Sequence, residues 1–130
     1  MIICCDIGQP TRAKLRLCVD LLVNLNMDFL KHSRMHVPAL YASGVRYRRE
    51  PMPGRGRRVE RFAVIPSVMR VGFGDCEDLA AWRIAELRLR GVRAVPWIIQ
   101  PQPKVFHVQV RHPDRTIEDP SLRLGMRGPG

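Results

Sequence analysis

The sequence predicts an α+β fold in which two helices pack against a small antiparallel sheet. Two segments, 12–31 and 76–90, lack glycine and proline and carry apolar residues at the three- and four-residue spacing of a helix. The last third of the chain instead alternates apolar and polar residues, which is the period of a strand. With 130 residues, of which 45% are hydrophobic and 26% charged, the chain suits one domain, 1–130, with a single core.

Residues 12–31 form the first predicted helix. Thr11 can cap its N-terminus by accepting a hydrogen bond from a backbone N–H of the first turn. Lys31 and His32 place positive charge at the C-terminal end, where the helix dipole is negative. The apolar side chains that recur along one face are Leu15, Cys18, Leu22, Leu25 and Phe29. Because Cys18 lies on this face, we expect a small core residue there rather than a reactive thiol.

The middle of the chain is predicted to hold a short strand and a long loop. A strand fits around 44–47, and a basic loop is predicted at about 50–61, because residues 50–58 have neither apolar content nor a regular period. Seven arginines lie between positions 46 and 61. The candidates for contact with a negatively charged partner are Arg46, Arg48, Arg49, Arg55, Arg57 and Arg58. A solvated loop explains the same arginines, and both interpretations stay open.

A second helix is predicted to begin at Cys76 and to run to about Arg90. Asp75 is a good N-cap, and Asp78, three residues later, can complete a capping box. Gly91 follows the helix and is the residue type that most often does so. The residues that share a face with Cys76 are Ala80, Ile84 and Leu87.

The last third is predicted to form antiparallel strands. The first strand covers 92–99 and contains Pro96, which suits an edge strand or a bulge because proline has no N–H to donate. The segments that follow are, in order, a connector at 100–103, a strand at 105–110, a turn at 112–114, a strand at 115–119 and a fraying tail at 127–130.

The net charge and the spacing of the cysteines bear on two classes of function, nucleic-acid binding and metal binding. The net charge is +10, and three of the 22 basic residues are lysine, so arginine supplies nearly all of it. Such a charge attracts nucleic acid, but no binding motif and no aromatic residues between the charges support that reading. Cys4 and Cys5 lack the spacing of a zinc site, so no metal is expected. With no membrane span and no signal peptide in the sequence, we expect a cytoplasmic protein.

Cys76 has the surroundings of a nucleophile. At the first turn of a helix the dipole favours the thiolate, and backbone N–H groups of Gly74, Asp75 and Cys76 can stabilise an oxyanion. Gly74 also permits a close approach of substrate. The acidic neighbours Asp75, Glu77 and Asp78 oppose the thiolate, so a cationic histidine is needed beside it. A cysteine that merely starts a helix remains the alternative.

His107 and Asp119 are the predicted partners of Cys76. His107 lies on the strand face opposite to Val108 and Val110, so the pattern does not make it a core residue. If residues 112–114 form a three-residue hairpin loop, position 107 pairs with 119 and the two Cβ atoms lie about 5 Å apart. An aspartate there can orient the imidazole. A structural histidine and a turn aspartate are the separate alternatives.

Three sequence blocks resemble those of the transglutaminase-like cysteine peptidases, which have a papain-like fold. The blocks are Gly74-Asp75-Cys76-Glu77-Asp78, His107-Val108-Gln109-Val110 and Glu118-Asp119-Pro120-Ser121. The resemblance is closest to short, stand-alone bacterial and bacteriophage members and covers about 40–126. It implies that Cys76 is the nucleophile, His107 the general base and acid, and Asp119 the orienting carboxylate. Val108 departs from the animal-type pattern, which leaves the acyl-acceptor site open.

The resemblance implies a cysteine-dependent amide hydrolase or acyl transferase that forms a thioester on Cys76. Its substrate would be a protein or peptide amide, and it would need neither a metal nor an organic cofactor. We expect hydrolysis rather than transfer, because a chain this short has little surface for an amine site. The alternative is a bacteriophage structural or assembly protein that uses the fold to bind other phage structural proteins, incorporated into a virion.

Overall fold

The computed structural model describes residues 2–6, 11–49 and 59–127, with the backbone alone for 2–6, 59 and 60. Its helices are α1 (Arg12–His32), α2 (Ile65–Val71), α3 (Cys76–Leu89), α4 (Pro120–Arg123) and the 3-10 turn η1 (Leu40–Ala42). Its strands are β1 (Ile2–Asp6), β2 (Arg46–Tyr47), β3 (Val59–Ala63), β4 (Phe73–Gly74), β5 (Val95–Gln102), β6 (Val105–Arg111) and β7 (Ile117–Glu118). The predicted α+β class is confirmed.

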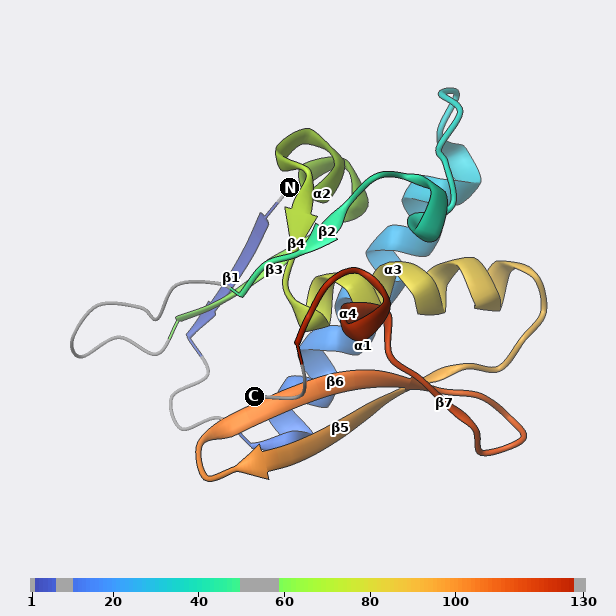
Figure 1. The fold of residues 1–130 in the computed structure, drawn as a ribbon. Coiled ribbons are helices and arrows are strands. Elements are labelled where there is room, and N and C mark those ends of the chain that lie inside the picture. Colours follow the sequence, from blue (N-terminus) through green and yellow to red (C-terminus); the bar gives the residue numbers. More distant parts are fainter. Residues whose placement is uncertain (1, 7–10, 50–58, 128–130) are drawn as a thin grey trace.

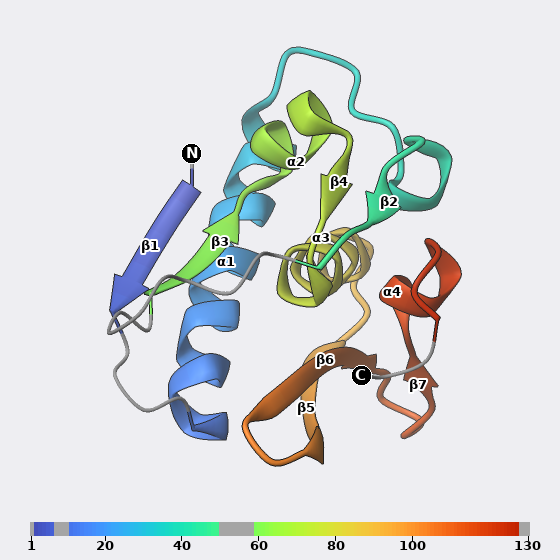
Figure 2. The same cartoon turned by 60° about the vertical axis from the view of Figure 1, so that its left-hand side comes forward.

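The helix α3 is the centre of the fold. Viewed nearly along its axis, it is surrounded by α1, by the β5–β6 hairpin, by α4 and by the β2–β4 pair (Figure 2). Eleven of its residues are buried, including Leu79, Trp82 and Ile84, which have no exposed surface. A helix that is buried all round needs apolar or small residues on every face, which is why α3 shows no wide polar face.

The caps predicted for both long helices are present. The Thr11 side chain accepts a hydrogen bond from the N–H of Lys14 at 3.2 Å. Asp75 and Asp78 form the reciprocal capping box at the start of α3. After the helix, Gly91 takes the left-handed conformation with φ +85°, which glycine adopts without strain.

The antiparallel sheet has the order β5-β6-β7, with α1 and α3 packed against it (Figure 1). Pro96 therefore lies on an edge strand, as the sequence predicted. Its carbonyl oxygen and that of Ala94 accept hydrogen bonds from the side chains of Arg16 and Arg88. The connector predicted at 100–103 is wrong, because β5 continues to Gln102 after an irregularity in the pairing.

The register predicted for the last hairpin is also wrong. Val110 pairs with Glu118 and Arg111 with Ile117, so position 107 is not opposite 119. The turn lies one residue later than predicted, because His112 donates its N–H to the Thr116 carbonyl at 2.9 Å, which leaves 113–115 and not 112–114 between the bonded pair. A shift of two residues keeps every side chain on its face, since the strand period is two. Asp119 therefore still lies on the side of the sheet that carries His107.

The strand predicted at 115–119 is correspondingly shorter. Asp119 ends it by capping α4, since its Oδ1 accepts the N–H of Leu122 at 3.2 Å. The short strand predicted around 44–47 is confirmed as β2, which pairs in parallel with β4. The pairs β1–β3 and β2–β4, η1 and α4 were not predicted. The predicted loop at about 50–61 is too long, because β3 begins at Val59 and pairs with β1. The rest of that loop, 50–58, and the tail beyond 127 lie outside the described residues.

Among the helices that the structure describes, none combines the length and the apolar character that crossing a membrane requires. The two long ones are α1, with 21 residues, and α3, with 14. The exposed side of α1 carries charged residues such as Arg12 and Lys31, and the buried residues of α3 include Glu77, Asp78 and Glu86. The length and charge of these helices fit packing inside this fold.

Two leucines on α1 test the packing of that helix. Leu22 has no exposed surface, whereas Leu21 beside it is 48% exposed. Leu22→Ala should lower the free energy of unfolding by about 2–5 kcal/mol, because it leaves a cavity in the core. Leu21→Ala should change it by less than about 0.5 kcal/mol. Urea denaturation measures both, and equal losses would contradict the observed orientation of α1.

Candidate active site

Cys76 begins α3 and lies at the junction of the helix with the sheet. Its side chain belongs to the main core together with Val108 of β6, and the residue is 7% exposed. The Cys76 Sγ is 3.4 Å from Glu77 Oε2, to which the thiol donates. A backbone hydrogen bond from the N–H of Val108 stabilises negative charge on the sulfur.

The thiol of Cys76 is held in its protonated form. Burial raises its pKa well above the ordinary value, and the negative charges of Glu77 and Asp75 raise it further. The N–H of Val108 lowers the pKa but does not reverse the shift. Burial is thus the main cause of the raised pKa, and the acidic neighbours that the sequence pointed to add to it.

The N–H groups predicted for the oxyanion are partly occupied. The N–H of Cys76 donates to Asp75 Oδ1 at 2.6 Å, and the N–H of Asp75 donates to Asp78 Oδ2 at 3.2 Å. The aspartates at the start of α3 thus bind backbone N–H groups that the sequence analysis had assigned to an oxyanion. Gly74 has a packing role as well, because a Cβ there would lie 3.1 Å from Leu79 Cδ2.

His107 and Asp119 are brought together despite the altered register. His107 Nε2 lies 2.7 Å from Asp119 Oδ2, and both side chains are nearly buried, with 5% and 9% exposed. If the register of the hairpin is continued, Asp119 lies opposite Gln109, two residues along the strand from His107, so the contact with His107 runs diagonally across the hairpin. Gln109, on the same strand face as His107, donates to the same oxygen at 3.1 Å.

The charge state of Asp119 determines which nitrogen of His107 is basic. Burial alone would raise the pKa of Asp119, but the hydrogen bonds from His107 and Gln109 lower it below its usual value. The carboxylate is therefore ionised and accepts, so Nε2 of His107 carries the proton that it donates. The other ring nitrogen, Nδ1, is then the one that can take a proton.

The strand β6 connects Cys76 with the His107–Asp119 pair. His107 and Val108 are consecutive, and the N–H of Val108 reaches the Cys76 sulfur. The residue whose N–H bonds to the sulfur and the residue that carries the imidazole are therefore direct neighbours on β6. In Figure 2, β6 passes beside the helix α3 that Cys76 begins.

Three residues near the thiol were missed as site residues by the sequence analysis. Glu77 accepts from the thiol, and Gln109 shares Asp119 with His107. Burial, together with the charges of Asp75 and Cys76, raises the pKa of Tyr47 to about 12. The period of β6 could have revealed Gln109, but only the long-range pairing of β2 with β4 brings Tyr47 here.

One group of potential metal ligands occurs among the described residues. Asp75, Cys76 and Glu77 place one ligand atom each within 4.8 Å of one another. A cysteine binds metal as the thiolate, and the raised pKa of Cys76 works against that form. The group therefore adds negative charge beside the thiol, and we assign it no metal.

The arginines predicted to bind a partner are only partly described. Arg46, Arg48 and Arg49 are exposed, and the Arg48 guanidinium lies 4.7 Å from the centre of the Phe73 ring. Arg55, Arg57 and Arg58 fall outside the described residues. The structure thus joins His107 to Asp119 and places Cys76 against the next residue of the same strand, and it describes three of the six predicted arginines.

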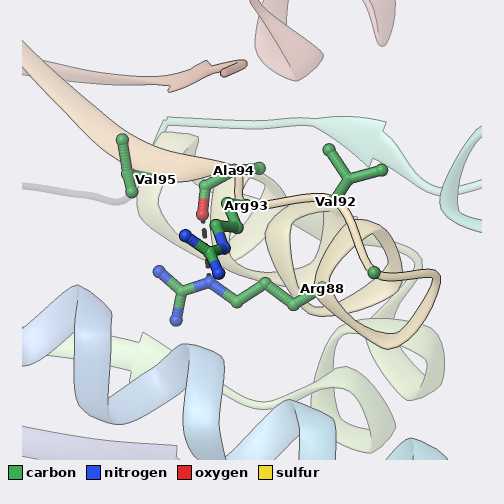
Figure 3. Close-up of a pocket in the computed structure, with 6 residues that line it drawn as sticks. Arg88, Val92, Arg93, Ala94 and Val95 are labelled. Atoms are coloured by element: carbon green, nitrogen blue, oxygen red, sulfur yellow. Dashed lines mark hydrogen bonds between the residues drawn. The ribbon is translucent and has the colours of Figure 1, made fainter.

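A hollow of about 460 Å³ lies at the opposite end of α3 (Figure 3). It is lined by Arg88, Arg93 and the residues around them, and Arg88 Nε donates to the Ala94 carbonyl at 3.0 Å. Arg88 follows Cys76 by twelve residues, which corresponds to about 18 Å along a helix. The hollow is therefore separate from the thiol.

Glu77 offers a direct test of the charge around the thiol. Glu77→Gln removes a negative charge and should lower the pKa of Cys76, although burial and Asp75 keep it above the ordinary value. The ultraviolet absorbance of the thiolate, with a Cys76→Ala blank, measures this pKa. Glu86→Gln is the control, since Glu86 is buried on the same helix and bonds to Arg83 and Leu40. A pKa that rises or stays fixed in Glu77→Gln would contradict this account.

Comparisons with known proteins do not extend this picture. The chain was compared with models of protein families, with curated proteins and with solved structures, and none of the three comparisons gave a match. What the site can do is therefore inferred from its own geometry. Its central features are a buried thiol, the N–H that points to it, and an imidazole bonded to an ionised carboxylate.

Proposed function

We propose that the protein is a cysteine-dependent amide hydrolase or acyl transferase that works through a thioester on Cys76, in a transglutaminase-like, papain-like fold. The observation that carries the proposal is the 2.7 Å hydrogen bond between His107 and Asp119, on the strand whose next residue contacts the Cys76 sulfur. This is the base-and-orienter arrangement that activates a nucleophile. The α+β architecture and the helix start at Cys76 fit the proposed family.

The proposed reaction begins with a neutral thiol and a neutral imidazole. As the Cys76 sulfur forms its bond to the amide carbonyl carbon, the thiol proton passes to Nδ1 of His107. The C–N bond then breaks, and the departing amine takes that proton, which leaves a thioester. Water attacks the thioester while His107 accepts a proton from it, and the protonated imidazole returns a proton to the sulfur as the acid is released.

The raised pKa of Cys76 fits transfer of the proton during attack. Burial and the acidic neighbours disfavour a standing thiolate, so the base must act in the same step as the nucleophile. The N–H of Val108 lies where it stabilises negative charge on the sulfur as that charge develops. Asp119 stabilises the imidazolium that forms. We propose water rather than an amine as the final acceptor.

The second candidate is a bacteriophage structural or assembly protein in which the site has no turnover. The features that favour it are the raised pKa of Cys76 and the use of two N–H groups by the capping box. Its docking surface would include the exposed Arg46, Arg48 and Arg49, and its partners would be acidic phage structural proteins. In this case the His107–Asp119 pair would serve stability alone.

Acylation of Cys76 tests the enzymatic proposal. Incubation with p-nitrophenyl acetate should release nitrophenol and place an acetyl group on Cys76, visible by mass spectrometry. Cys76→Ala should abolish this reaction, and His107→Ala or Asp119→Asn should slow it about 10²-fold or more. Cys18→Ala is the matched control and should react at the wild-type rate, because Cys18 lies on the α1 face that packs against the core.

A glutamine-containing peptide then distinguishes water from amine as acceptor. Hydrolysis predicts a glutamate product and free ammonia, whereas transfer predicts a product that carries an added primary amine. If the folded protein reacts with neither probe and the His107 and Asp119 variants only lose stability, the assembly interpretation replaces the enzymatic one.

A further inference from the structure

Glu118 lies immediately before Asp119 and binds three other parts of the fold. The Tyr41 hydroxyl and Arg83 Nε both donate to its Oε2, the latter at 2.6 Å. His112 Nε2 lies 2.8 Å from its Oε1. These partners come from η1, from α3 and from the hairpin loop, so a single carboxylate connects three elements next to the proposed orienting residue.

This carboxylate is kept charged although it is largely buried. Its side chain is 14% exposed, and that of Arg83 is 16% exposed. Burial alone would raise the pKa of Glu118, but the hydrogen bonds from Tyr41, Arg83 and His112 lower it. Charge-assisted bonds of this kind are about twice as strong as neutral ones.

The contact between Glu118 and Arg83 fixes β7 relative to the helix of the thiol. Arg83 follows Cys76 by seven residues, or two turns and about 10.5 Å of the same helix. The helix α3 is thus joined to the β6–β7 hairpin at two places: the Cys76 sulfur meets the N–H of Val108, and Arg83 meets Glu118. Because the helix and the hairpin are joined by two separate contacts, the hairpin cannot rotate about one contact without breaking the other.

The ladder between β6 and β7 is too short to do this alone. Two residue pairs join the strands, Val110 with Glu118 and Arg111 with Ile117, and one further backbone bond, from His112 to Thr116, closes the turn. Two pairs give marginal stability. Asp119 comes directly after this ladder, at the point where the chain turns into α4. Its position therefore depends on what holds Glu118.

We propose that Glu118 is a positioning residue of the active site: through Arg83 and Tyr41 it holds Asp119 at hydrogen-bonding distance from His107. This inference rests on the proposed function for its catalytic meaning. It predicts that loss of Glu118 loosens the His107–Asp119 contact and weakens the base that serves Cys76, even where the fold survives.

Glu86 provides a matched control for this role. Its side chain is also buried, lies 3.4 Å from Arg83 Nη1 and accepts the N–H of Leu40 at 2.8 Å. It therefore shares with Glu118 a bond to Arg83 and a link to η1. It lies on α3 and not on the hairpin, so its removal should lower stability without moving Asp119.

The test compares Glu118→Ala, Glu118→Gln and Glu86→Gln by two readouts. The first is the rate at which iodoacetamide alkylates Cys76 at pH 7, followed by mass spectrometry. Glu118→Ala should lower this rate about tenfold, a loss typical of a small displacement of a catalytic group. Glu118→Gln, whose amide oxygen can still accept from Arg83, should lose less, and Glu86→Gln should keep the wild-type rate.

The second readout is the set of ¹⁵N chemical shifts of the His107 ring, which report which nitrogen carries the proton. Glu118→Ala should move them toward the values of Asp119→Asn, whereas Glu86→Gln should leave them unchanged. In a His107→Ala background, Glu118→Ala should have no further effect on alkylation, since coupled residues are not additive.

Different results separate the failure of this inference from failure of the proposed function. If Glu118→Ala leaves both readouts unchanged, or if Glu86→Gln changes them equally, the positioning role is wrong. If His107→Ala does not slow alkylation of Cys76 in the otherwise wild-type protein, the proposed function is wrong, and the ring shifts alone then decide the role of Glu118. Should Glu118→Ala fail to fold, Glu118→Gln gives the same comparison.

Discussion

The burial of α3 on nearly all sides is the constraint on which the rest of the structure depends. Both core clusters draw residues from this helix: Ala80 and Ile84 face α1 and β6, whereas Leu79 and Trp82 face α2 and η1. A helix in this position fixes the direction of every element around it. Its first residue is Cys76, so the packing that forms the core also determines where the thiol lies.

The same burial has opposing consequences for chemistry. It brings Cys76 beside the strand that carries His107, but it also raises the pKa of the thiol above that of a free cysteine. An enzyme can use such a thiol only if a base takes the proton during attack. His107, bonded to the ionised Asp119, with Glu118 held by Arg83 one residue away, is arranged to supply that base.

Local signals predicted the elements, and long-range contacts account for what was missed. The caps Thr11 and Asp75 and the edge position of Pro96 depend on neighbouring residues, and all three are confirmed. The hairpin register failed because the loop closes with a bond from His112 to Thr116, which composition does not reveal. Because strand side chains alternate with a period of two, the face predicted for Asp119 was still correct.

Two features could not be predicted from the sequence: the bonds already made by the N–H groups at the start of α3, and the contacts of Glu118. A capping box predicts that Asp75 and Asp78 bind backbone N–H groups, yet the same residues also suggest an oxyanion site, and sequence does not say which use prevails. Glu118 meets Arg83 from a position 35 residues away and Tyr41 from 77 residues away. No periodicity connects residues at such separations.

The central claim is that His107 acts as the base for Cys76, and the pH dependence of Cys76 alkylation in wild type and His107→Ala tests it most directly. The account predicts that the wild-type thiol reacts faster than the variant near neutral pH, because His107 removes its proton during attack, and that the two rates converge at high pH, where the thiol ionises unaided. Two profiles that coincide across the whole range would contradict it.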